Sequence, residues 1–442
     1  MIEVTMLFIV EFSIFLSIYL YIFKNNIKNN LPLFYIITIM FAFMFLGPLY
    51  GYVNNIKSLF GNYLWDYYDD VLVYYILGIS MFFIGYILSI KNTKKNKKIN
   101  ISLLKNIDKN FIRFGMLIGV LGYILWAVTS GRSIYNIFLL DYFGASNNLD
   151  NFMNIEKGNN YLRQMVEIFI PILTLSFFSN MKKKEIAIWT LIALIIYISQ
   201  GFRYRIILLI SAYTFIYIFF YVKSYKKFFM STGLLLILTL YTVTQLTYYR
   251  WEIRANILGQ EAKRVSSDYA NETVLSTFGH YTRNYMPFAS LVKYMEKNDI
   301  EYGYGETMFG HIFVRMLPSF FFPDGKPFPP AVKVSAESWE SAEGKFAGEA
   351  YAATGGVYYE FGVIGIILFY IVIGYLIGIL TKKIKKAKNS VHLAFYLTII
   401  VSFFQLLTRG YLPGYVISFG YMLLPFIYIK FFKSALWNSK NV

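Results

Sequence analysis

Long runs of apolar residues, separated by short polar connections, dominate this chain. A helix needs about 20 predominantly apolar residues to cross the hydrocarbon core of a bilayer. The segments that fit this pattern are residues 4–23, 32–53, 71–90, 111–129, 162–180, 186–200, 205–222, 228–248, 356–380, 391–408 and 412–429. The sixth and seventh are short and almost without a loop between them, which indicates a hairpin. The pattern predicts an all-α polytopic integral membrane protein with about 11 transmembrane helices.

Composition supports this class and excludes several others. Of the 442 residues, 57% are hydrophobic and 15% are charged, whereas a soluble domain has about 25% charged residues. A cytosolic enzyme, a disordered chain and a nucleic-acid binder are thereby excluded. The chain has no Cys and three His, so we expect no metal centre. It also has no glycine-rich phosphate loop, and we expect no cofactor.

The placement of charge predicts the orientation of the chain. Alternate connections, beginning with the one after the first span, hold 24 Lys and Arg residues and two acids, Asp108 and Glu185. The rest of the chain holds 18 basic and 23 acidic residues. Short cytoplasmic loops are enriched in Lys and Arg. The N-terminus is therefore expected outside and the C-terminus in the cytoplasm, and the net charge of +17 requires no nucleic acid.

One connection is too long to be a simple turn. Residues 250–355 are expected to form an external loop domain between transmembrane helices 1–8, in residues 1–249, and helices 9–11, in residues 356–442. Within this loop, stretches 262–276 and 281–297 have the spacing of amphipathic helices. Stretch 318–330 is rich in Pro and is expected to be irregular.

Arginines mark the outer side. Arg203 and Arg205 lie at the outer end of the hairpin, and no acidic residue lies nearby in sequence to neutralise them. An arginine at this depth either snorkels to the interface or lines a polar cavity. On the same side follow Arg250, Arg254, Arg283, Arg315 and Arg409, for which structural ion pairs are an alternative. Arg binds phosphate oxygens in a bidentate fork, so this set favours a phosphate or diphosphate ligand.

Three residues could take up a proton on that side. His280 and His311 lie in the external loop, and a neutral His can act as a general base near neutral pH. A structural hydrogen bond is the alternative for each. Glu349 lies just above the ninth span and Glu360 lies within it. A carboxylate inside the membrane is costly, so Glu360 is expected to face a cavity or one of the arginines.

Taken together, these segments resemble a known family, the oligosaccharide repeat unit polymerases of the O-antigen polymerase (Wzy-type) group. By span layout the resemblance covers most of the chain, and by motif about residues 190–365. The motifs are Gly201-Phe202-Arg203-Tyr204-Arg205, Tyr249-Arg250, Leu317-Pro318, Glu349-x-Tyr351 and Tyr359-Glu360-Phe361-Gly362-x-x-Gly365.

This resemblance implies a glycosyltransferase that uses a polyprenyl-diphosphate-linked glycan as donor. A hydroxyl of a fresh lipid-linked repeat unit attacks the growing glycan, and polyprenyl diphosphate leaves. Arg203, Arg205, Arg250 and Arg254 are assigned to the departing diphosphate, with Arg283 and Arg315 as second choices. The base is sought among His280, Glu349 and His311, and His280 is placed first because Arg283 lies one helical turn away.

The resemblance also implies where and with what the protein acts. It places the chain in the bacterial cytoplasmic (inner) membrane, with the active site on the outer face. The partners are membrane lipids, the lipid-linked oligosaccharide as both donor and acceptor, and a chain-length regulator protein. Two alternatives stay open, an O-antigen ligase-type glycosyltransferase and a flippase or exporter of lipid-linked glycans. The concentration of candidate ligand residues on one side favours an enzyme over a transporter.

Overall fold

The computed structural model describes most of the chain, and the description below is confined to that part. It comprises residues 2–59, 62–90, 107–129, 160–200, 203–222, 274–317, 351–387 and 389–437, together with residues 227–228, 230, 233, 321–322, 326–327, 329–330 and 334.

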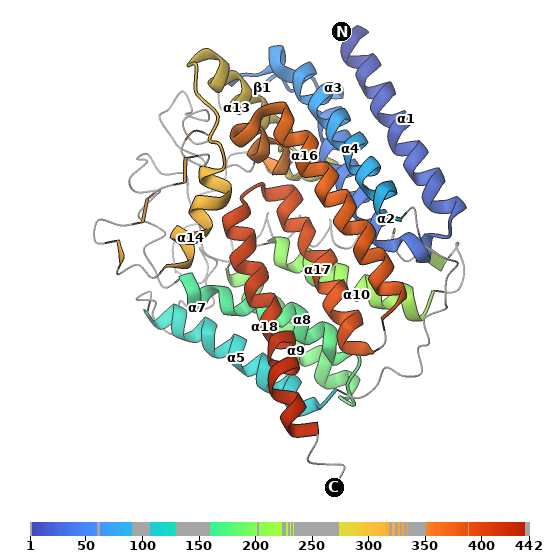
Figure 1. Ribbon diagram of the computed structural model, residues 1–442, viewed down its shortest axis with the longest axis vertical. Helices are drawn as coiled ribbons and strands as arrows, with labels where there is room; N and C mark the ends of the chain where they lie inside the picture. Colours follow the sequence, from blue (N-terminus) through green and yellow to red (C-terminus); the bar gives the residue numbers. More distant parts are fainter. Residues whose placement is uncertain are drawn as a thin grey trace.

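Helices account for nearly all of the described structure (Figure 1). The α-helices are α1 (Ile2–Lys24), α2 (Leu31–Met40), α3 (Gly47–Val53), α4 (Tyr68–Ile90), α5 (Lys109–Thr129), α7 (Asn160–Gln164), α8 (Phe169–Ser176), α9 (Lys183–Ser199), α10 (Arg203–Phe220), α12 (Val274–Tyr281), α13 (Tyr285–Lys297), α14 (His311–Met316), α16 (Ala352–Lys385), α17 (Ser390–Arg409) and α18 (Leu412–Trp437). The 3-10 segments are η1 (Ile27–Asn30), η3 (Trp65–Tyr67) and η7 (Met165–Ile168), and the π-helical segments are η2 (Phe41–Leu46) and η9 (Glu306–Gly310). Strands β1 (Ser58–Leu59) and β2 (Asn62–Tyr63) form a small antiparallel hairpin.

Within the described residues, eight helical segments are long and apolar enough to cross a membrane. They are Glu3–Lys24, Ile27–Val53, Trp65–Ile90, Lys109–Thr129, Arg203–Phe220, Ala352–Lys385, Ser390–Arg409 and Leu412–Phe431. The predicted span 186–200 corresponds to α9, which has 17 residues and is shorter than the others. The predicted span 228–248 lies almost wholly outside the described residues. The polytopic helical fold is thus confirmed, and the count of eleven spans stays a prediction.

The predicted span 162–180 is not one straight helix. It consists of α7, the 3-10 segment η7 and α8 in succession. Pro171 lies in the first turn of α8 and has no backbone N–H, so it cannot bond the carbonyl four residues earlier, which belongs to Glu167. The chain tightens into a 3-10 turn at this place. This break sets the orientation of Glu167, which is central to the site described below.

The pairing of α4 with α16 depends on small residues. A Cβ atom at Gly85 would collide with the backbone of Ile371, and one at Gly374 would collide with the backbone of Phe82. Helices in lipid commonly associate through close approach of this kind, because no hydrophobic driving force holds them together there. Gly85 and Gly374 are therefore the positions at which α4 and α16 approach each other closely.

The helix α16 begins at Ala352, four residues before the predicted ninth span, and it is broken at Gly362. Gly362 has a φ of 59° and a ψ of −145°, a combination that is essentially restricted to glycine. A Cβ atom there would collide with the ring of Tyr302. The segment before the break is buried nearly throughout and packs on the turn between α17 and α18. The break therefore lets a short helical segment enter the protein at an angle to the long span.

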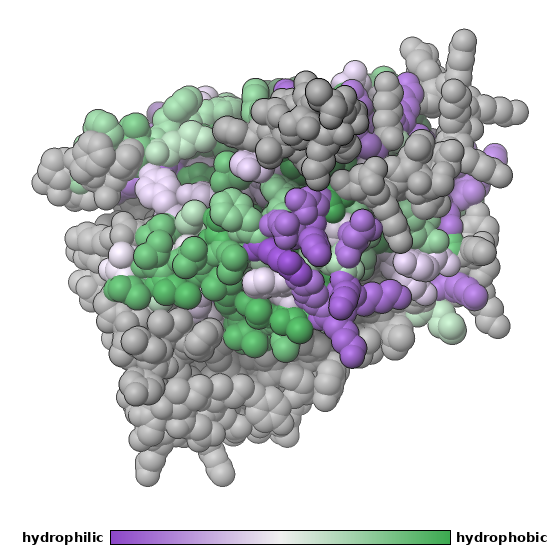
Figure 2. Space-filling model, turned by 90° about the horizontal axis from the view of Figure 1, so that it is seen from below, coloured by the Kyte–Doolittle hydropathy of each residue, from purple (hydrophilic) through white to green (hydrophobic). Residues whose placement is uncertain are grey.

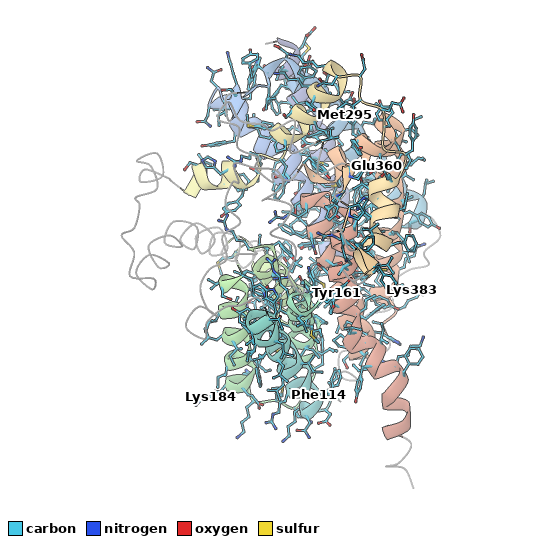
Figure 3. The ribbon with its side chains drawn as sticks, turned by 90° about the vertical axis from the view of Figure 1, so that its left-hand side faces the viewer. Phe114, Tyr161, Lys184, Met295, Glu360 and Lys383 are labelled. Atoms are coloured by element: carbon cyan, nitrogen blue, oxygen red, sulfur yellow. The ribbon has the colours of Figure 1, made fainter. Side chains whose placement is uncertain are left out.

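Large apolar side chains lie exposed on the outside of the helices, as lipid contact requires. They include Leu16 of α1, Leu121 of α5, Leu191 of α9 and Leu368 of α16. Viewed from below, hydrophilic side chains gather in one patch beside a hydrophobic patch (Figure 2). Figure 3 shows Met295 and Glu360 toward one end of the molecule and Phe114 and Lys184 toward the other.

Candidate active site

The turn between α17 and α18 is the point where several elements meet. Gly410 has a φ of 72°, a left-handed conformation that glycine adopts without steric cost. A Cβ atom at Gly410 would collide with the carbonyl oxygen of Ala352, so the beginning of α16 packs directly on the turn. The side chain of Asn284, which precedes α13, donates a hydrogen bond of 2.5 Å to the Thr408 carbonyl. The turn therefore holds α13 and α16 against α17.

The two residues that flank Gly410 extend the turn toward α10 and α14. The guanidinium carbon of Arg409 lies 5.8 Å from the centroid of the Tyr204 ring in α10. The Tyr411 ring lies 4.9 Å from the guanidinium carbon of Arg315 in α14. Contacts of a guanidinium group with an aromatic face fix its position and leave its positive charge in place. Arg315 of α14 and Arg409 of α17, far apart in sequence, thus lie at one turn, and Tyr204 of α10 contacts it.

Arg203 is the first residue of α10 and is half-buried. Its NH1 group donates a hydrogen bond to the Tyr281 hydroxyl, and its guanidinium carbon lies 4.8 Å from the centroid of the same ring. Tyr281 is the last residue of α12. Positive charge in the first turn of a helix is unfavourable with respect to the helix dipole. The site therefore has a strongly positive potential where α10 begins.

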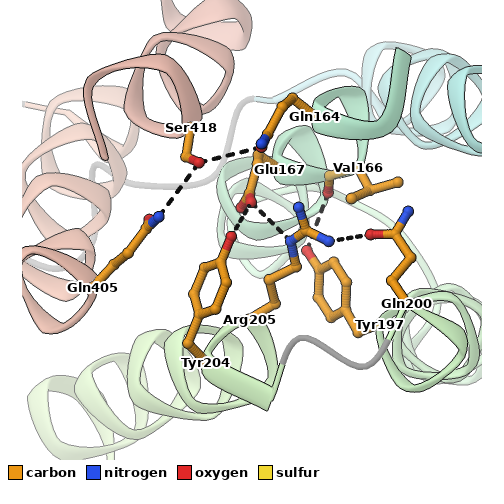
Figure 4. Close-up of polar contacts among 9 residues, drawn as sticks. All are labelled: Gln164, Val166, Glu167, Tyr197, Gln200, Tyr204, Arg205, Gln405 and Ser418. Atoms are coloured by element: carbon orange, nitrogen blue, oxygen red, sulfur yellow. Dashed lines mark hydrogen bonds and ion pairs between the residues drawn. The ribbon is translucent and has the colours of Figure 1, made fainter. Parts of the chain in front are cut away.

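Arg205 is completely buried and has an acidic partner (Figure 4). Its Nε donates a hydrogen bond of 2.7 Å to Oε1 of Glu167, which also accepts one of 2.8 Å from the Tyr204 hydroxyl. Its NH1 donates to the side-chain oxygen of Gln200. No acid close in sequence neutralises the hairpin arginines, but Glu167 of η7 does so for Arg205 across a helix interface. Arg205 therefore belongs to a structural ion pair, whereas Arg203 has a tyrosine as its partner.

A second chain of polar side chains lies beside this pair (Figure 4). Gln405 of α17 donates to the Ser418 hydroxyl at 3.4 Å, and that hydroxyl donates to the side-chain oxygen of Gln164 at 3.2 Å. Within the described part of the chain, Oε2 of Glu167, Nε2 of Gln200 and Oε1 of Gln405 are buried and have no hydrogen-bond partner. Since buried polar atoms without partners are costly, this network has hydrogen-bonding capacity to offer a bound molecule or water.

His311 lies at the junction of η9 and α14 and is 5% exposed. Its Nδ1 is buried and has no hydrogen-bond partner among the described residues. Burial, the largest cause, lowers the pKa of His311 below its ordinary value. The carboxylate of Glu306 opposes this lowering of the pKa, and the guanidinium of Arg315 adds to it. A neutral imidazole near an arginine is the form that a general base needs.

His280 is exposed, and its Nδ1 lies 3.3 Å from NH1 of Arg283. A guanidinium group can only donate, so Nδ1 accepts here and the proton of the neutral ring lies on Nε2. In this tautomer Nε2 can donate a hydrogen bond to a ligand but cannot take up a proton. The structure brings His280 and Arg283 together as the helical spacing predicts, and it gives His280 the character of a donor.

Of the two surroundings expected for Glu360, a cavity or an arginine, the described structure shows no arginine contact. Its carboxylate is held by backbone N–H groups. Its Oε2 accepts a hydrogen bond of 2.6 Å from the backbone N–H of Gly305, and its Oε1 accepts one of 3.2 Å from that of Thr307. The backbone carbonyl of Glu360 accepts another of 2.9 Å from Tyr304. The completely buried Glu360 therefore fixes the beginning of η9 on α16 and so positions His311.

Three of the predicted site residues, Arg250, Arg254 and Glu349, lie outside the described residues. Within the part of the chain that the structure describes, no group of three or more His, Cys, Asp or Glu residues could hold a metal ion. Sequence reasoning named Arg409 among the outer arginines but assigned it no role, and it missed Glu167 as the partner of Arg205. Pro171 is the one sequence signal that marks the neighbourhood of Glu167 as irregular.

Comparison with known proteins provides the family. The profile of the family described as O-antigen polysaccharide polymerase Wzy matches residues 1–441, the whole chain. The chain belongs to this family. Comparisons with curated proteins and with solved structures gave no match.

The family describes the general activity. Its members are glycosyltransferase-type polymerases that act on lipid-linked oligosaccharide repeat units in membranes. Together with the eight apolar helices, this indicates a multi-pass protein of the bacterial inner membrane. The arginine cluster around the turn between α17 and α18 is the candidate active site of this polymerase.

Proposed function

We propose that the protein transfers the growing glycan from polyprenyl diphosphate to a new polyprenyl-diphosphate-linked repeat unit on the outer face of the cytoplasmic membrane. The distribution of Lys and Arg among the connections supports this orientation. The glycan served by the reaction is an O-antigen, a capsule or a similar surface polysaccharide.

The observation that carries the proposal is the placement of three arginines. Arg315 and Arg409 lie at the turn between α17 and α18, and Arg203 precedes Tyr204, whose ring Arg409 contacts. Each lies on a tyrosine ring, which holds the guanidinium group in place before any ligand binds. Preorganised positive charge is most effective where negative charge develops in the transition state. The departing diphosphate is such a group, and the beginning of α10 adds the positive end of a helix dipole.

The reaction forms one bond and breaks one. The hydroxyl oxygen of the acceptor sugar attacks the anomeric carbon of the growing glycan, and a new carbon–oxygen bond forms. The bond from that carbon to the diphosphate breaks, and its electron pair leaves on the diphosphate oxygen. We assign the diphosphate to Arg203, Arg315 and Arg409, with Arg283 beside them. The arginines stabilise the charge that builds up on the departing oxygen.

The acceptor hydroxyl also has to lose its proton. We assign the base to His311, because burial favours its neutral form and its Nδ1 has no partner in the described structure. His280 is assigned to hold a phosphate or sugar oxygen through Nε2–H, since Arg283 occupies Nδ1. Arg205 is assigned a positioning role, because Glu167 and Gln200 already accept its hydrogen bonds. Arg250, Arg254 and Glu349 stay predictions, as does a chain-length regulator partner.

Reconstitution tests this function. Purified protein in liposomes receives only its lipid-linked repeat unit, and the products are separated on a gel. A ladder of glycan lengths, formed without added nucleotide, is the expected result. Movement of the lipid-linked glycan across the bilayer without any ladder would instead show a flippase and overturn the proposal.

A matched pair of variants tests the site itself. Arg203→Ala is expected to abolish the ladder. Arg113→Ala is the control, because Arg113 pairs with Glu185 at 2.6 Å next to Phe114 and Lys184, at the opposite end of the molecule from Glu360 (Figure 3). Equal loss of polymer in both variants would mean that the arginine cluster has no special role.

A further inference from the structure

The segment of η9 and α14 has its apolar side chains on the outside. Phe309 is 56% exposed, Phe313 is 69% exposed and Met316 is 52% exposed. Their spacing of four and three residues places them on one face of a helix. Leu317 continues this face, since it is also exposed. We refer to Phe309, Phe313, Met316 and Leu317 as the α14 apolar face.

The opposite face of the same segment is polar and turned inward. His311 is buried there, and Arg315 lies half-buried on the ring of Tyr411. A helix in water usually has the reverse arrangement, with polar residues outside and apolar residues inside. Exposure of several large apolar side chains in one patch marks a surface that binds something apolar. The α14 apolar face therefore needs an apolar occupant.

The position of α14 restricts what that occupant can be. The helix packs against α18, and Figure 1 places it at the edge of the molecule. NH1 of Arg315 lies 3.6 Å from the point where a Cβ atom of Gly414 would stand, two residues into the α18 span. The short helix α14, which carries the apolar face, thus lies beside the beginning of a helix that is long and apolar enough to span the membrane.

Positive charge lies on the inward side of the same short helix and near its C-terminal end. Arg315 lies two residues from Phe313, and Nζ of Lys326 donates a hydrogen bond of 3.1 Å to the Arg315 carbonyl. Lys326 also lies over the ring of Tyr161, at 5.3 Å from its centroid. The surface therefore combines cations with an adjoining apolar stripe. It is complementary to an amphiphile that has an anionic head and a long hydrocarbon tail.

We propose that the α14 apolar face binds the polyprenyl chain of the substrate while Arg315 binds its diphosphate. This inference rests on the proposed function and adds to it the site of the lipid tail. Head and tail are joined in one molecule, and the two surfaces are joined in one short helix. Contact along isoprene units explains why the exposed residues include two Phe side chains and why they face away from His311.

The first experiment compares substrates with tails of different length. Repeat units on the full-length polyprenyl chain and on farnesyl are supplied to the reconstituted protein, and KM is measured for each. Wild type is expected to prefer the long tail. In the double variant Phe309→Ser/Phe313→Ser this preference is expected to fall at least about tenfold, since about 1.4 kcal/mol of lost apolar burial corresponds to that factor.

Phe114→Ser provides the matched control. Phe114 is also an exposed Phe, at 54%, and it lies on α5 at the far end of the molecule from Glu360 (Figure 3). Its substitution is expected to leave the preference for the long tail unchanged. An unchanged preference in the double variant as well would overturn the tail site and leave the polymerase proposal standing. Absence of any ladder from wild type with either substrate would instead overturn the polymerase proposal.

Photo-cross-linking separates substrate binding from simple contact with the bilayer. A benzophenone amino acid is placed at position 313, and at position 114 as control, in liposomes that contain radiolabelled lipid-linked repeat unit. Labelling at position 313 is expected to exceed that at position 114 and to be competed by unlabelled repeat unit. Cross-links at position 313 to phospholipid alone, without competition, would show that α14 merely lies in the bilayer surface and would overturn the proposal.

Discussion

Arg203 and Arg205 lie two residues apart at the beginning of α10, and their surroundings differ. Arg205 is completely buried, and Glu167 and Gln200 accept hydrogen bonds from its guanidinium group. Arg203 is half-buried and lies on Tyr281, which fixes its position without cancelling its charge. In our proposal, Arg205 therefore holds the hairpin in place and Arg203 offers its charge to a ligand.

The comparison shows why a pair of arginines in a membrane hairpin has no single meaning. A buried guanidinium is tolerated only with a partner, because the loss of hydration costs several kcal/mol per ion. Glu167 supplies that partner for Arg205. Once Arg205 is fixed, α10 presents Arg203 in a defined direction toward α12. The buried pair is therefore the structural support of the exposed charge.

Removal of the buried partner is expected to have the largest effect. Glu167→Ala leaves Arg205 buried and unpaired, and the protein should lose about 3–5 kcal/mol of stability. The measurement is the melting temperature of the purified protein in detergent, with the yield of monodisperse protein beside it.

A double variant shows whether the loss of stability in Glu167→Ala comes from the unpaired charge of Arg205 or from the lost side-chain volume. In Glu167→Leu/Arg205→Met both charges are replaced by apolar side chains, and most of the stability is expected to return. A melting temperature as low in the double variant as in Glu167→Ala would show that the pair is not the source of the loss.

Removal of the Arg203 charge should lower the rate of polymer formation without unfolding the protein. Arg203→Ala is expected to lower the rate of polymer formation about 10²–10³-fold, the usual effect of losing one transition-state donor. Its melting temperature should remain close to that of wild type, because Arg203 has no acidic partner in the described structure. Arg203→Lys should recover only part of the rate, since Lys lacks the bidentate fork. Loss of folded protein in Arg203→Ala would remove the distinction between the two arginines.

Much of this architecture could be predicted from the sequence. Apolar runs located the long helices, and the spacing of residues 281–297 predicted an amphipathic helix where α13 now lies. The spacing of His280 and Arg283 by one helical turn predicted that the two residues lie together. Each of these signals is local, because it depends on residues within a few helical turns.

The contacts between distant segments could not be predicted in this way. Glu167 meets Arg205 only because Pro171 tightens the preceding turn and because two helices pack in a particular register. Arg409 ends a helix as an ordinary basic residue would, and its contact with Tyr204 follows from the turn at Gly410. The length of an apolar run likewise does not reveal the break at Gly362, which follows from its φ and ψ.

His311, the proposed base, is a group of the candidate site whose protonation changes with pH. Its lowered pKa keeps the imidazole neutral down to more acidic pH than an ordinary His. If it is the base, the rate should stay level through the pH range in which an ordinary His titrates and decline only at more acidic pH, through the lowered pKa. The stability that its neutral form contributes is likewise present above the unfolded pKa and lost as pH falls through the folded one.

The variant His311→Gln separates a base from a structural residue. As a base, His311 should be worth about 10²-fold in rate, and the acidic limb of the pH profile should disappear from the residual activity. His280→Gln is the matched control, and it should retain that limb while it binds the substrate less tightly. A pH profile of His311→Gln with the limb intact at full rate would assign the base elsewhere.

Glu11 offers a direct test of the free energy that a buried carboxyl group without a hydrogen-bond partner costs, and the expected effect is the smallest of those predicted. It lies in the middle of α1, is completely buried, and neither of its carboxylate oxygens has a hydrogen-bond partner in the described part of the chain. Glu167 is equally buried but is paired, so the two residues form a natural contrast.

Glu11→Leu is expected to raise the free energy of unfolding by about 1–3 kcal/mol, the cost of one unsatisfied buried polar group. The readout is the melting temperature, with polymer formation measured in parallel and expected to be unchanged. A lower melting temperature would show that the carboxyl group has a stabilising contact after all, and loss of polymer in a stable Glu11→Leu protein would place a second functional carboxyl group in α1.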